Sequence, residues 1–278
     1  MTDHIAGKVI IVTGAGSGFG RRVAERTAAR GARLLCADIN SAAAEAVAKD
    51  IRATGGEALA ITADVTRIED MQNLAQAALD AHGVIDVMVN NAGIMPLAFL
   101  SDHATALDAW NRCIDINFRG VMNGTIAVHD QMMAQGHGHI VNLSSIYGNH
   151  PVTGAAVYGA TKAAVNYFSN AVRMESRGKI KVTVVKPTGV PTTGLGETVV
   201  NKAGSAGILG QYMQEFLPSA LQSMQGTLPP ELADRENSGY FSLNADDIAE
   251  AIVHVIDQPH GVTLSDVTVR ATGDYYIL

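Results

Sequence analysis

The sequence predicts an α/β fold, in which a doubly wound parallel sheet carries helices on both faces. Two observations predict it. Short runs of continuous apolar and β-branched residues alternate with longer segments of helical periodicity, an order typical of parallel sheets that are buried on both faces. A glycine-rich turn also joins the first strand-like run to the first helical segment, which indicates a Rossmann-type architecture. We find no linker and no internal repeat, so a single domain over residues 1–278 is expected.

The elements follow from local pattern and from capping residues. Apolar, β-branched runs predict strands at residues 8–13, 33–37, 58–62, 84–89, 139–143, 181–185 and 266–270. Helices are expected at 18–30, 41–53, 67–82, 104–123 (which could continue to 135), 157–177 and 246–257. Gly31 and Gly83 follow two of these helices, where glycine is common. Ser41 is expected to be the N-cap of the second helix.

Residues 188–242 interrupt the alternation of strands and helices. This segment is rich in Gly, Leu, Met and Gln, and Met213, Phe216, Leu217 and Leu221 recur at roughly helical spacing. Two interpretations remain open, an elaboration packed on the core and a lid over an apolar substrate. Both can hold together, because long insertions in compact domains are often active-site lids.

Composition and charge exclude several classes of partner. The net charge is −7 and no block is rich in Lys and Arg, so neither a nucleic acid nor an anionic membrane is expected as a partner. Cys36 and Cys113 are expected to be reduced core thiols. No apolar run reaches the length of about 18 residues that a membrane helix needs, and no targeting segment is apparent at the N-terminus. A cytoplasmic location is therefore expected.

The glycine-rich turn predicts a dinucleotide site. It reads Thr13-Gly14-Ala15-Gly16-Ser17-Gly18-Phe19-Gly20, with a strand before it and a helix after it. Glycines let the backbone approach a phosphate closely, and the helix N-terminus offers free N–H groups to it. Asp38 ends the second strand, where an acid can bind the adenosine ribose hydroxyls and repel a 2′-phosphate. NAD is therefore expected rather than NADP, with Arg21 and Arg22 facing solvent.

Tyr158 and Lys162 predict the chemistry. They lie four residues apart in an expected helix, so both project from one face. A nearby cation favours the ionised phenol, which is expected to lower the pKa of Tyr158 from its usual value of about 10. A tyrosine of that kind can exchange a proton with an alcohol or a carbonyl. Ser145 precedes Tyr158 by 13 residues, and Asn117 precedes it by 41.

In these motifs the chain resembles the short-chain dehydrogenase/reductase family, from Gly7 to Arg270. The turn has the family's TGxxxGxG form, residues 90–93 match its NNAG motif, and Asp64-Val65 resembles its adenine-contacting pair. The resemblance and the turn together imply these cofactor contacts: Gly14, Ser17, Gly18, Phe19, Gly20, Asp38, Ile39, Asp64, Val65, Asn91, Ala92, Gly93, Tyr158, Lys162, Pro187, Val190 and Thr192.

The resemblance also implies roles for the catalytic residues Asn117, Ser145, Tyr158 and Lys162. Tyr158 would be the general acid/base, and Lys162 would lower its pKa and bind the nicotinamide ribose. Ser145 would donate a hydrogen bond to the substrate oxygen. Asn117 would hold a water that connects Lys162 to solvent. The family is commonly tetrameric, so a homo-oligomer (a tetramer or a dimer) is expected, with the apolar tail at residues 275–278 packed on a neighbouring subunit.

The chain departs from the family after the sixth strand. The family usually has Pro-Gly there, whereas this chain has Pro187-Thr188-Gly189. Thr188 must avoid a positive φ or bear strain. Residues expected near the substrate are Tyr147, His150, Met213 and Leu217. No metal site is expected, because His137 and His139 have no apparent third ligand.

These observations predict an NAD-dependent oxidoreductase that interconverts a secondary alcohol and a ketone. The composition of residues 188–242 favours an apolar substrate of medium or large size, such as a hydroxysteroid, a terpenoid or an aromatic alcohol. Two alternatives stay open. One is reduction of a 3-oxoacyl group on an acidic carrier protein, which would need a basic docking patch. The other is a catalytically silent dinucleotide-binding sensor or scaffold, which would not need the four catalytic residues.

Overall fold

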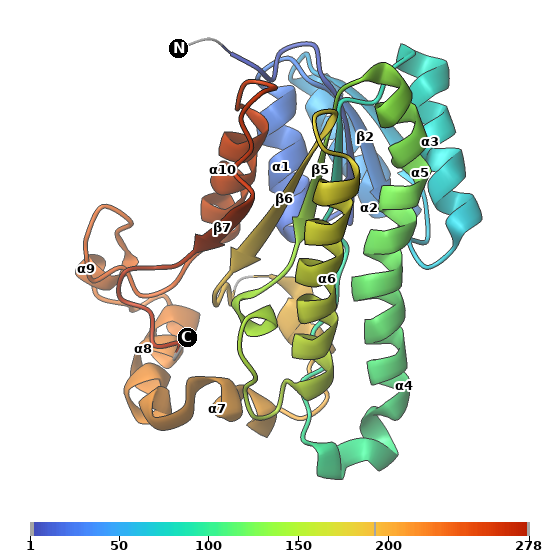
Figure 1. Cartoon of the computed structure of the whole chain (residues 1–278). Helices are drawn as coiled ribbons and strands as arrows, with labels where there is room; N and C mark the ends of the chain where they lie inside the picture. Colours follow the sequence, from blue (N-terminus) through green and yellow to red (C-terminus); the bar gives the residue numbers. More distant parts are fainter. Residues whose placement is uncertain (1–2, 192, 277–278) are drawn as a thin grey trace.

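The central sheet has seven parallel strands in the order β3-β2-β1-β4-β5-β6-β7 (Figure 1). The computed structural model describes residues 3–191 and 193–276. The strands are β1 Val9–Thr13, β2 Arg33–Asp38, β3 Glu57–Thr62, β4 Val87–Asn90, β5 Gly138–Leu143, β6 Ile180–Pro187 and β7 Asp266–Val269. The predicted doubly wound Rossmann-type fold is thereby confirmed.

The strand order places a crevice at the C-terminal ends of β1 and β4. The chain runs from β1 outward to β3, then returns across the sheet and adds β4 to β7 on the other side of β1. Helices that follow neighbouring strands therefore leave in opposite directions at this point, and ligands of open α/β sheets bind there. β1 itself is buried along its whole length because strands and helices enclose it on every side.

Two layers of helices cover the two faces of the sheet. On one face α1 Gly18–Ala28, α2 Ser41–Ala53 and α10 Ala245–Ile256 share a core with Ile10 and Val12 of β1. On the other face α3 Ile68–His82, α5 Gly120–Gln135 and α6 Ala156–Glu175 share a second core with Val9 and Ile11. Successive residues of a strand point to opposite faces, so continuous apolar strands feed both cores.

The long helix expected from residue 104 is two α-helices joined by a wider turn. α4 spans His103–Ile114, a π-helical turn spans Asp115–Arg119, and α5 continues to Gln135. The extension to residue 135 is confirmed. π-helical turns occur frequently at functional sites, and this one contains Asn117.

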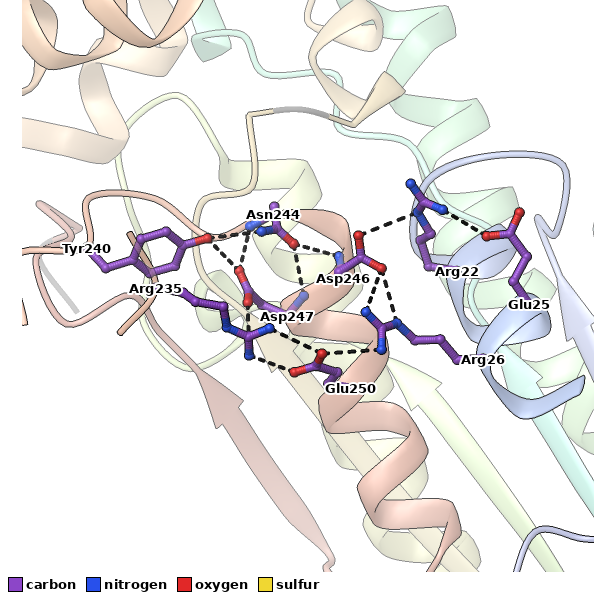
Figure 2. A network of polar contacts seen from close by, with 9 residues as sticks. All are labelled: Arg22, Glu25, Arg26, Arg235, Tyr240, Asn244, Asp246, Asp247 and Glu250. Atoms are coloured by element: carbon purple, nitrogen blue, oxygen red, sulfur yellow. Dashed lines mark hydrogen bonds and ion pairs between the residues drawn. The ribbon is translucent and has the colours of Figure 1, made fainter. Parts of the chain in front are cut away.

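Residues 188–242 form short helices beyond the C-terminal ends of the strands (Figure 1). They are α7 Ala203–Leu209, α8 Met213–Gln225 and α9 Pro230–Ala233, with one 3₁₀ segment before α7 and another between α7 and α8. The end of this segment is tied to α10, because the Tyr240 hydroxyl donates to Asp247 at 2.8 Å and Arg235 pairs with Glu250 at 2.6 Å (Figure 2). α10 is tied in turn to α1 through Arg26 and Asp246 at 2.9 Å.

The helix caps and the cysteines can be compared with the expectations from the sequence. The N-cap of α2 is Asn40 rather than Ser41, because the Asn40 side chain accepts a hydrogen bond from the backbone N–H of Ala43 at 3.1 Å. Gly83 ends α3 in the left-handed conformation, with φ of 72°. Both cysteines are buried and unpaired, as expected. Within the described residues, no helix combines the length and apolarity that crossing a membrane requires, and no group of three or more potential ligands could hold a metal.

Candidate active site

The glycine-rich turn leaves the N-terminus of α1 open to a ligand. Gly14 and Gly18 adopt positive φ of 63° and 52°, which side chains rarely tolerate. A Cβ on Gly20 would overlap the carbonyl oxygen of Gly14, so glycine there lets α1 pack directly on the turn. Within the described residues, the N-cap residue Ser17 makes no side-chain capping bond. The first N–H groups of α1 are therefore available to a phosphate, and the site fits the pyrophosphate of a dinucleotide.

Asp38 lies at the end of β2 and faces the same cavity as the turn. Its carboxylate accepts hydrogen bonds from the backbone N–H groups of Gly16 and Asn40, both at 2.9 Å. These two bonds fix the carboxylate beside the turn. Ile39 follows it at the cavity wall and is largely exposed.

The two arginines after the turn are engaged elsewhere. Arg21 pairs with Glu25 at 2.7 Å and with Asp50 at 3.0 Å. Arg22 pairs with Glu25 at 2.9 Å and points toward Asp246 on α10 (Figure 2). Neither guanidinium lines the cavity in the described part of the chain.

The NNAG motif is fastened to β1. The Asn91 amide donates to the carbonyl of Thr13 at 2.8 Å, and the Thr13 hydroxyl accepts from the backbone N–H of Asn91 at 3.0 Å. Asn90, the residue before this loop, is buried, and its amide donates a hydrogen bond to the Asn142 side chain on β5 at 2.8 Å. These bonds hold Asn91, Ala92 and Gly93 at the cavity wall.

Asp64 and Val65 form the neighbouring part of the wall. The Asp64 carboxylate accepts from the backbone N–H of Thr66 at 2.9 Å, which orients it at the end of β3. The carbonyl of Val65 accepts from the Asn123 amide at 2.9 Å. A Cβ on Gly120 would lie 2.7 Å from the Val65 side chain, so α5 approaches this loop closely.

Tyr158, Lys162 and Ser145 meet at the floor of the cavity. Tyr158 is only 5% exposed, and the Ser145 hydroxyl lies near enough to its phenol to act on the pKa of that group. The Lys162 ammonium lies 5.8 Å from the centre of the Tyr158 ring and donates to the carbonyl of Leu143 at 2.8 Å. All three side chains line the cavity. The helical spacing therefore brings the phenol and the ammonium together as expected.

The pKa of Tyr158 differs from the expectation. Burial raises it to about 12, while the Ser145 hydroxyl acts to lower it. Burial also lowers the pKa of Lys162 to about 8. Desolvation disfavours both charged forms, so in the protein alone it outweighs the effect expected from the neighbouring cation. Burial of Tyr158 thus opposes the lowering of its pKa that was expected from Lys162.

Asn117 lies beneath the floor, fully buried in the π-helical turn. Its side chain accepts from the backbone N–H of Ile94 at 2.9 Å and donates to the carbonyl of the same residue at 2.8 Å. A Cβ on Gly93 would lie 3.3 Å from the Asn117 oxygen and 3.7 Å from the Lys162 nitrogen. Asn117 thus fixes the loop that approaches Lys162, and its amide is already engaged by that loop.

One cavity of about 690 Å³ joins the dinucleotide side to the catalytic side. Of the residues expected at the substrate, Tyr147 lines it. His150 is exposed, Met213 packs in an apolar cluster with Ile208 and Leu209, and Leu217 is 47% exposed. These last three do not line the cavity within the described chain. Among the expected cofactor residues, Pro187 and Val190 line it, Gly20 lies behind it, and Thr192 falls outside the described residues.

Part of the apolar wall of the cavity was not predicted from the sequence. Ile94, Met95, Ile208, Leu209 and Phe216 line the cavity and make its walls apolar. Tyr276 also lines it, and its ring packs against the Tyr147 ring of the same chain, with centroids 6.4 Å apart. The aromatic character of the tail is visible in the sequence, but it was assigned to a neighbouring subunit.

Comparison with curated proteins places the chain among oxidoreductases. A family model described as short chain dehydrogenase matches residues 8–203. An uncharacterised oxidoreductase of Listeria monocytogenes is 35% identical over 271 residues, which are 96% of this chain and 98% of the relative. A 2,5-dichloro-2,5-cyclohexadiene-1,4-diol dehydrogenase of Sphingobium indicum is 37% identical over 195 residues, which are 69% of this chain and 76% of the relative.

Solved structures share the fold. A short chain dehydrogenase/reductase from Burkholderia phymatum in complex with NAD has a TM-score of 0.75 and 27% identity, covering 96% of this chain and 90% of that one. A 7α-hydroxysteroid dehydrogenase complexed with NADH and 7-oxo glycochenodeoxycholic acid has a TM-score of 0.79 and 23% identity, covering 99% and 97%. At that identity the second likeness speaks for the fold alone. The chain therefore belongs to the short-chain dehydrogenase/reductase family of oxidoreductases.

Proposed function

We propose that the protein is an NAD-dependent dehydrogenase that interconverts a secondary alcohol and a ketone. One observation carries the proposal: Ser145, Tyr158 and Lys162 converge on the same cavity that contains the glycine turn and Asp38. A silent binding protein would not need this arrangement of a buried phenol beside an ammonium and a hydroxyl. The nicotinamide, when bound, supplies or accepts the hydride.

The chain's own residues handle the proton and the oxygen. In ketone reduction Tyr158 donates its proton to the carbonyl oxygen, and its high pKa keeps it protonated for that step. The Ser145 hydroxyl donates to the same oxygen and stabilises the charge that develops there. Lys162 lies close enough to favour the phenolate after the transfer, since it approaches the Tyr158 ring. In alcohol oxidation the same groups act in reverse.

Two features support NAD over NADP. The Asp38 carboxylate is held beside the turn, where it would repel a 2′-phosphate. Arg21 and Arg22 are paired with carboxylates, so neither is placed to bind such a phosphate. The Burkholderia phymatum relative was solved with NAD, which is consistent with this choice.

The substrate is proposed to be an apolar ring-bearing alcohol of medium or large size. The apolar wall of Ile94, Met95, Leu209 and Phe216 favours hydrocarbon over charge. Residues 188–242 contribute part of that wall and would act as a lid. The Sphingobium indicum relative is named for a cyclic diol, which supports a ring substrate.

The test is the absorbance of reduced nicotinamide with NAD⁺ or NADP⁺ and a panel of steroid, terpene, aromatic and short aliphatic secondary alcohols. We expect turnover with NAD⁺ on the cyclic members of the panel. Tyr158→Phe should abolish it, and Tyr167→Phe on the exposed side of the same helix should not. A wild-type protein that binds NADH but oxidises no alcohol and reduces no ketone would refute the proposal.

A further inference from the structure

The C-terminal segment of this chain returns to its own active site. After β7 the chain runs back toward α8, and its last described residues lie beside that helix (Figure 1). Tyr276 reaches the cavity there and packs against Tyr147 and Phe216, with ring centroids 6.4 Å and 6.3 Å away. Tyr275 packs against Phe241 at 6.0 Å. The tail is thus seated on aromatic side chains of the segment 188–242.

Asp274 holds the tail in place. Its side chain is only 3% exposed, and both carboxylate oxygens are bonded. One accepts from the Thr188 hydroxyl at 3.0 Å, and the other accepts from the Arg270 guanidinium at 2.6 Å. Arg270 also donates to the carbonyl of Tyr276 at 2.7 Å. Removing one partner of a buried carboxylate is costly, so this cluster is a specific fastening.

The position of the tail explains why Pro187-Thr188-Gly189 differs from the Pro-Gly that the family usually has after the sixth strand. Thr188 is not among the described residues with positive φ, and it supplies the hydroxyl that Asp274 needs. Gly189 does not have positive φ either, yet a Cβ there would overlap the phenol oxygen of Tyr276. Thr188 thus holds the tail, and Gly189 makes room for it. The two residues are explained together by the position of the tail.

The hydroxyl group of Tyr147 is available to bind a ligand. The residue is 6% exposed and lines the cavity, and its hydroxyl has no hydrogen-bond partner among the described residues. Burial raises the pKa of this phenol, so it stays neutral and can donate. A buried hydroxyl left unpaired is unfavourable, and a substrate oxygen would relieve that cost.

We propose that residues 270–276 form a fixed wall of the substrate site in the same chain, fastened through Asp274, and that Tyr147 beside Tyr276 binds a second oxygen of a ring substrate. This rests on the proposed function, since Tyr158 then acts on the first oxygen. The substrate class is narrowed from ring alcohols to ring alcohols that carry a second hydroxyl or carbonyl group.

The fastening is tested without any substrate, by hydrogen–deuterium exchange of the whole protein. The backbone N–H groups of Gly273 and Asp274 donate to Tyr240 and Ala271, so they report on the tail. Thr188→Val and Asp274→Asn should speed exchange at these two positions at least tenfold and leave β1 unchanged. Thr188→Ser keeps the hydroxyl and should exchange like wild type, and Thr227→Val in the exposed part of the segment 188–242 is the control. Unchanged exchange in folded Thr188→Val would overturn the fixed wall.

The second oxygen is tested with cyclohexanol, cyclohexane-1,2-diol and cyclohexane-1,4-diol. We expect the wild-type kcat/KM to be at least about tenfold higher for one diol than for cyclohexanol. Tyr147→Phe should lower that preference about tenfold through KM, and the pH profile of kcat should not move. A wild type that favours cyclohexanol, or a variant that loses both substrates equally, would overturn the assignment of Tyr147. Failure of the wild type on every alcohol would refute the proposed function and with it this assignment, while the exchange experiment would still decide the wall.

Discussion

The two sides of the cavity are built differently. On the dinucleotide side, the wall residues follow the ends of strands and lie within short motifs, as with Gly14 after β1 and Asp38 at the end of β2. On the substrate side, the wall is assembled from segments far apart in the chain, and Thr188 bonds to Asp274 across 86 residues. Local motifs can be read from one sequence, whereas a wall made by distant segments cannot. Binding residues often lie on loops that a rigid scaffold positions, and the substrate side follows that pattern.

Tyr158 lies where the two sides meet, so its substitution should have the largest effect. Tyr158→Phe removes the proton donor and should reduce kcat by about 10²- to 10⁴-fold. The affinity for NADH should change by no more than about threefold, because the turn and Asp38 are untouched. Steady-state kinetics and NADH fluorescence titration measure the two quantities. Tyr167→Phe, 81% exposed on the same helix, is the matched control. An active Tyr158→Phe would remove the chemistry from this residue.

The difference in packing predicts a difference in stability. Leu74 on α3 is fully buried in the core, and Leu74→Ala should lower the free energy of unfolding by about 2–5 kcal/mol. Leu217 on α8 is about half exposed, and Leu217→Ala should cost about 0.5 kcal/mol or less. Urea denaturation compares them. Equal losses would show that the substrate side is as firmly packed as the sheet, which would break the comparison.

We expect the choice between NAD and NADP to depend on the charge of Asp38. Asp38→Asn keeps an acceptor for the N–H of Gly16 but removes the negative charge that repels a 2′-phosphate. The ratio of kcat/KM for NAD⁺ to that for NADP⁺ should fall on the order of tenfold. Asp130→Ala, at an exposed position on α5, should leave the ratio unchanged. A constant ratio in Asp38→Asn would assign the choice to another residue.

The pH dependence of alcohol oxidation gives a second test of Tyr158. In the proposed mechanism oxidation needs Tyr158 to accept a proton, and burial raises the pKa of Tyr158 to about 12. The phenolate fraction therefore grows with pH below that value, so kcat/KM for oxidation at saturating NAD⁺ should rise between about pH 7 and 10, by at most about tenfold per unit. Reduction needs the neutral phenol and should stay flat or fall. Opposite slopes would exclude Tyr158 as the titrating group, provided chemistry limits the rate.

The elements were predictable because their signals are local. The strand expected at 139–143 is observed at Gly138–Leu143, since its apolar run both predicts burial and forms the strand. Residues 84–86 were expected in a strand but precede β4, because Ile85 is buried without joining the ladder. Ser41 and Asn40 are both good capping residues, and only the backbone geometry selects Asn40.

The sequence predicted which residues meet in the cavity better than it predicted their pKa values. Four-residue spacing brings Lys162 beside Tyr158, but it does not reveal that burial dominates both pKa values or that the ammonium donates to Leu143. The exposure of His150 and the entry of Tyr276 into the cavity depend on how loops return to the sheet. No periodicity in those loops carries that information.

The π-helical turn at Asp115–Arg119 marks a place where the length of the chain can change. Successive residues of an α-helix are about 100° apart around its axis, because a turn holds about 3.6 residues, so losing one residue from regular helix rotates everything that follows by about that angle. A π-helical turn closes i→i+5 hydrogen bonds and so accommodates one additional residue within a single turn. Losing one residue there would restore regular α-helix and leave Val128 and Met132 facing the core they fill. Among related chains, a gap of one residue within this long helical segment should therefore fall at residues 115–119.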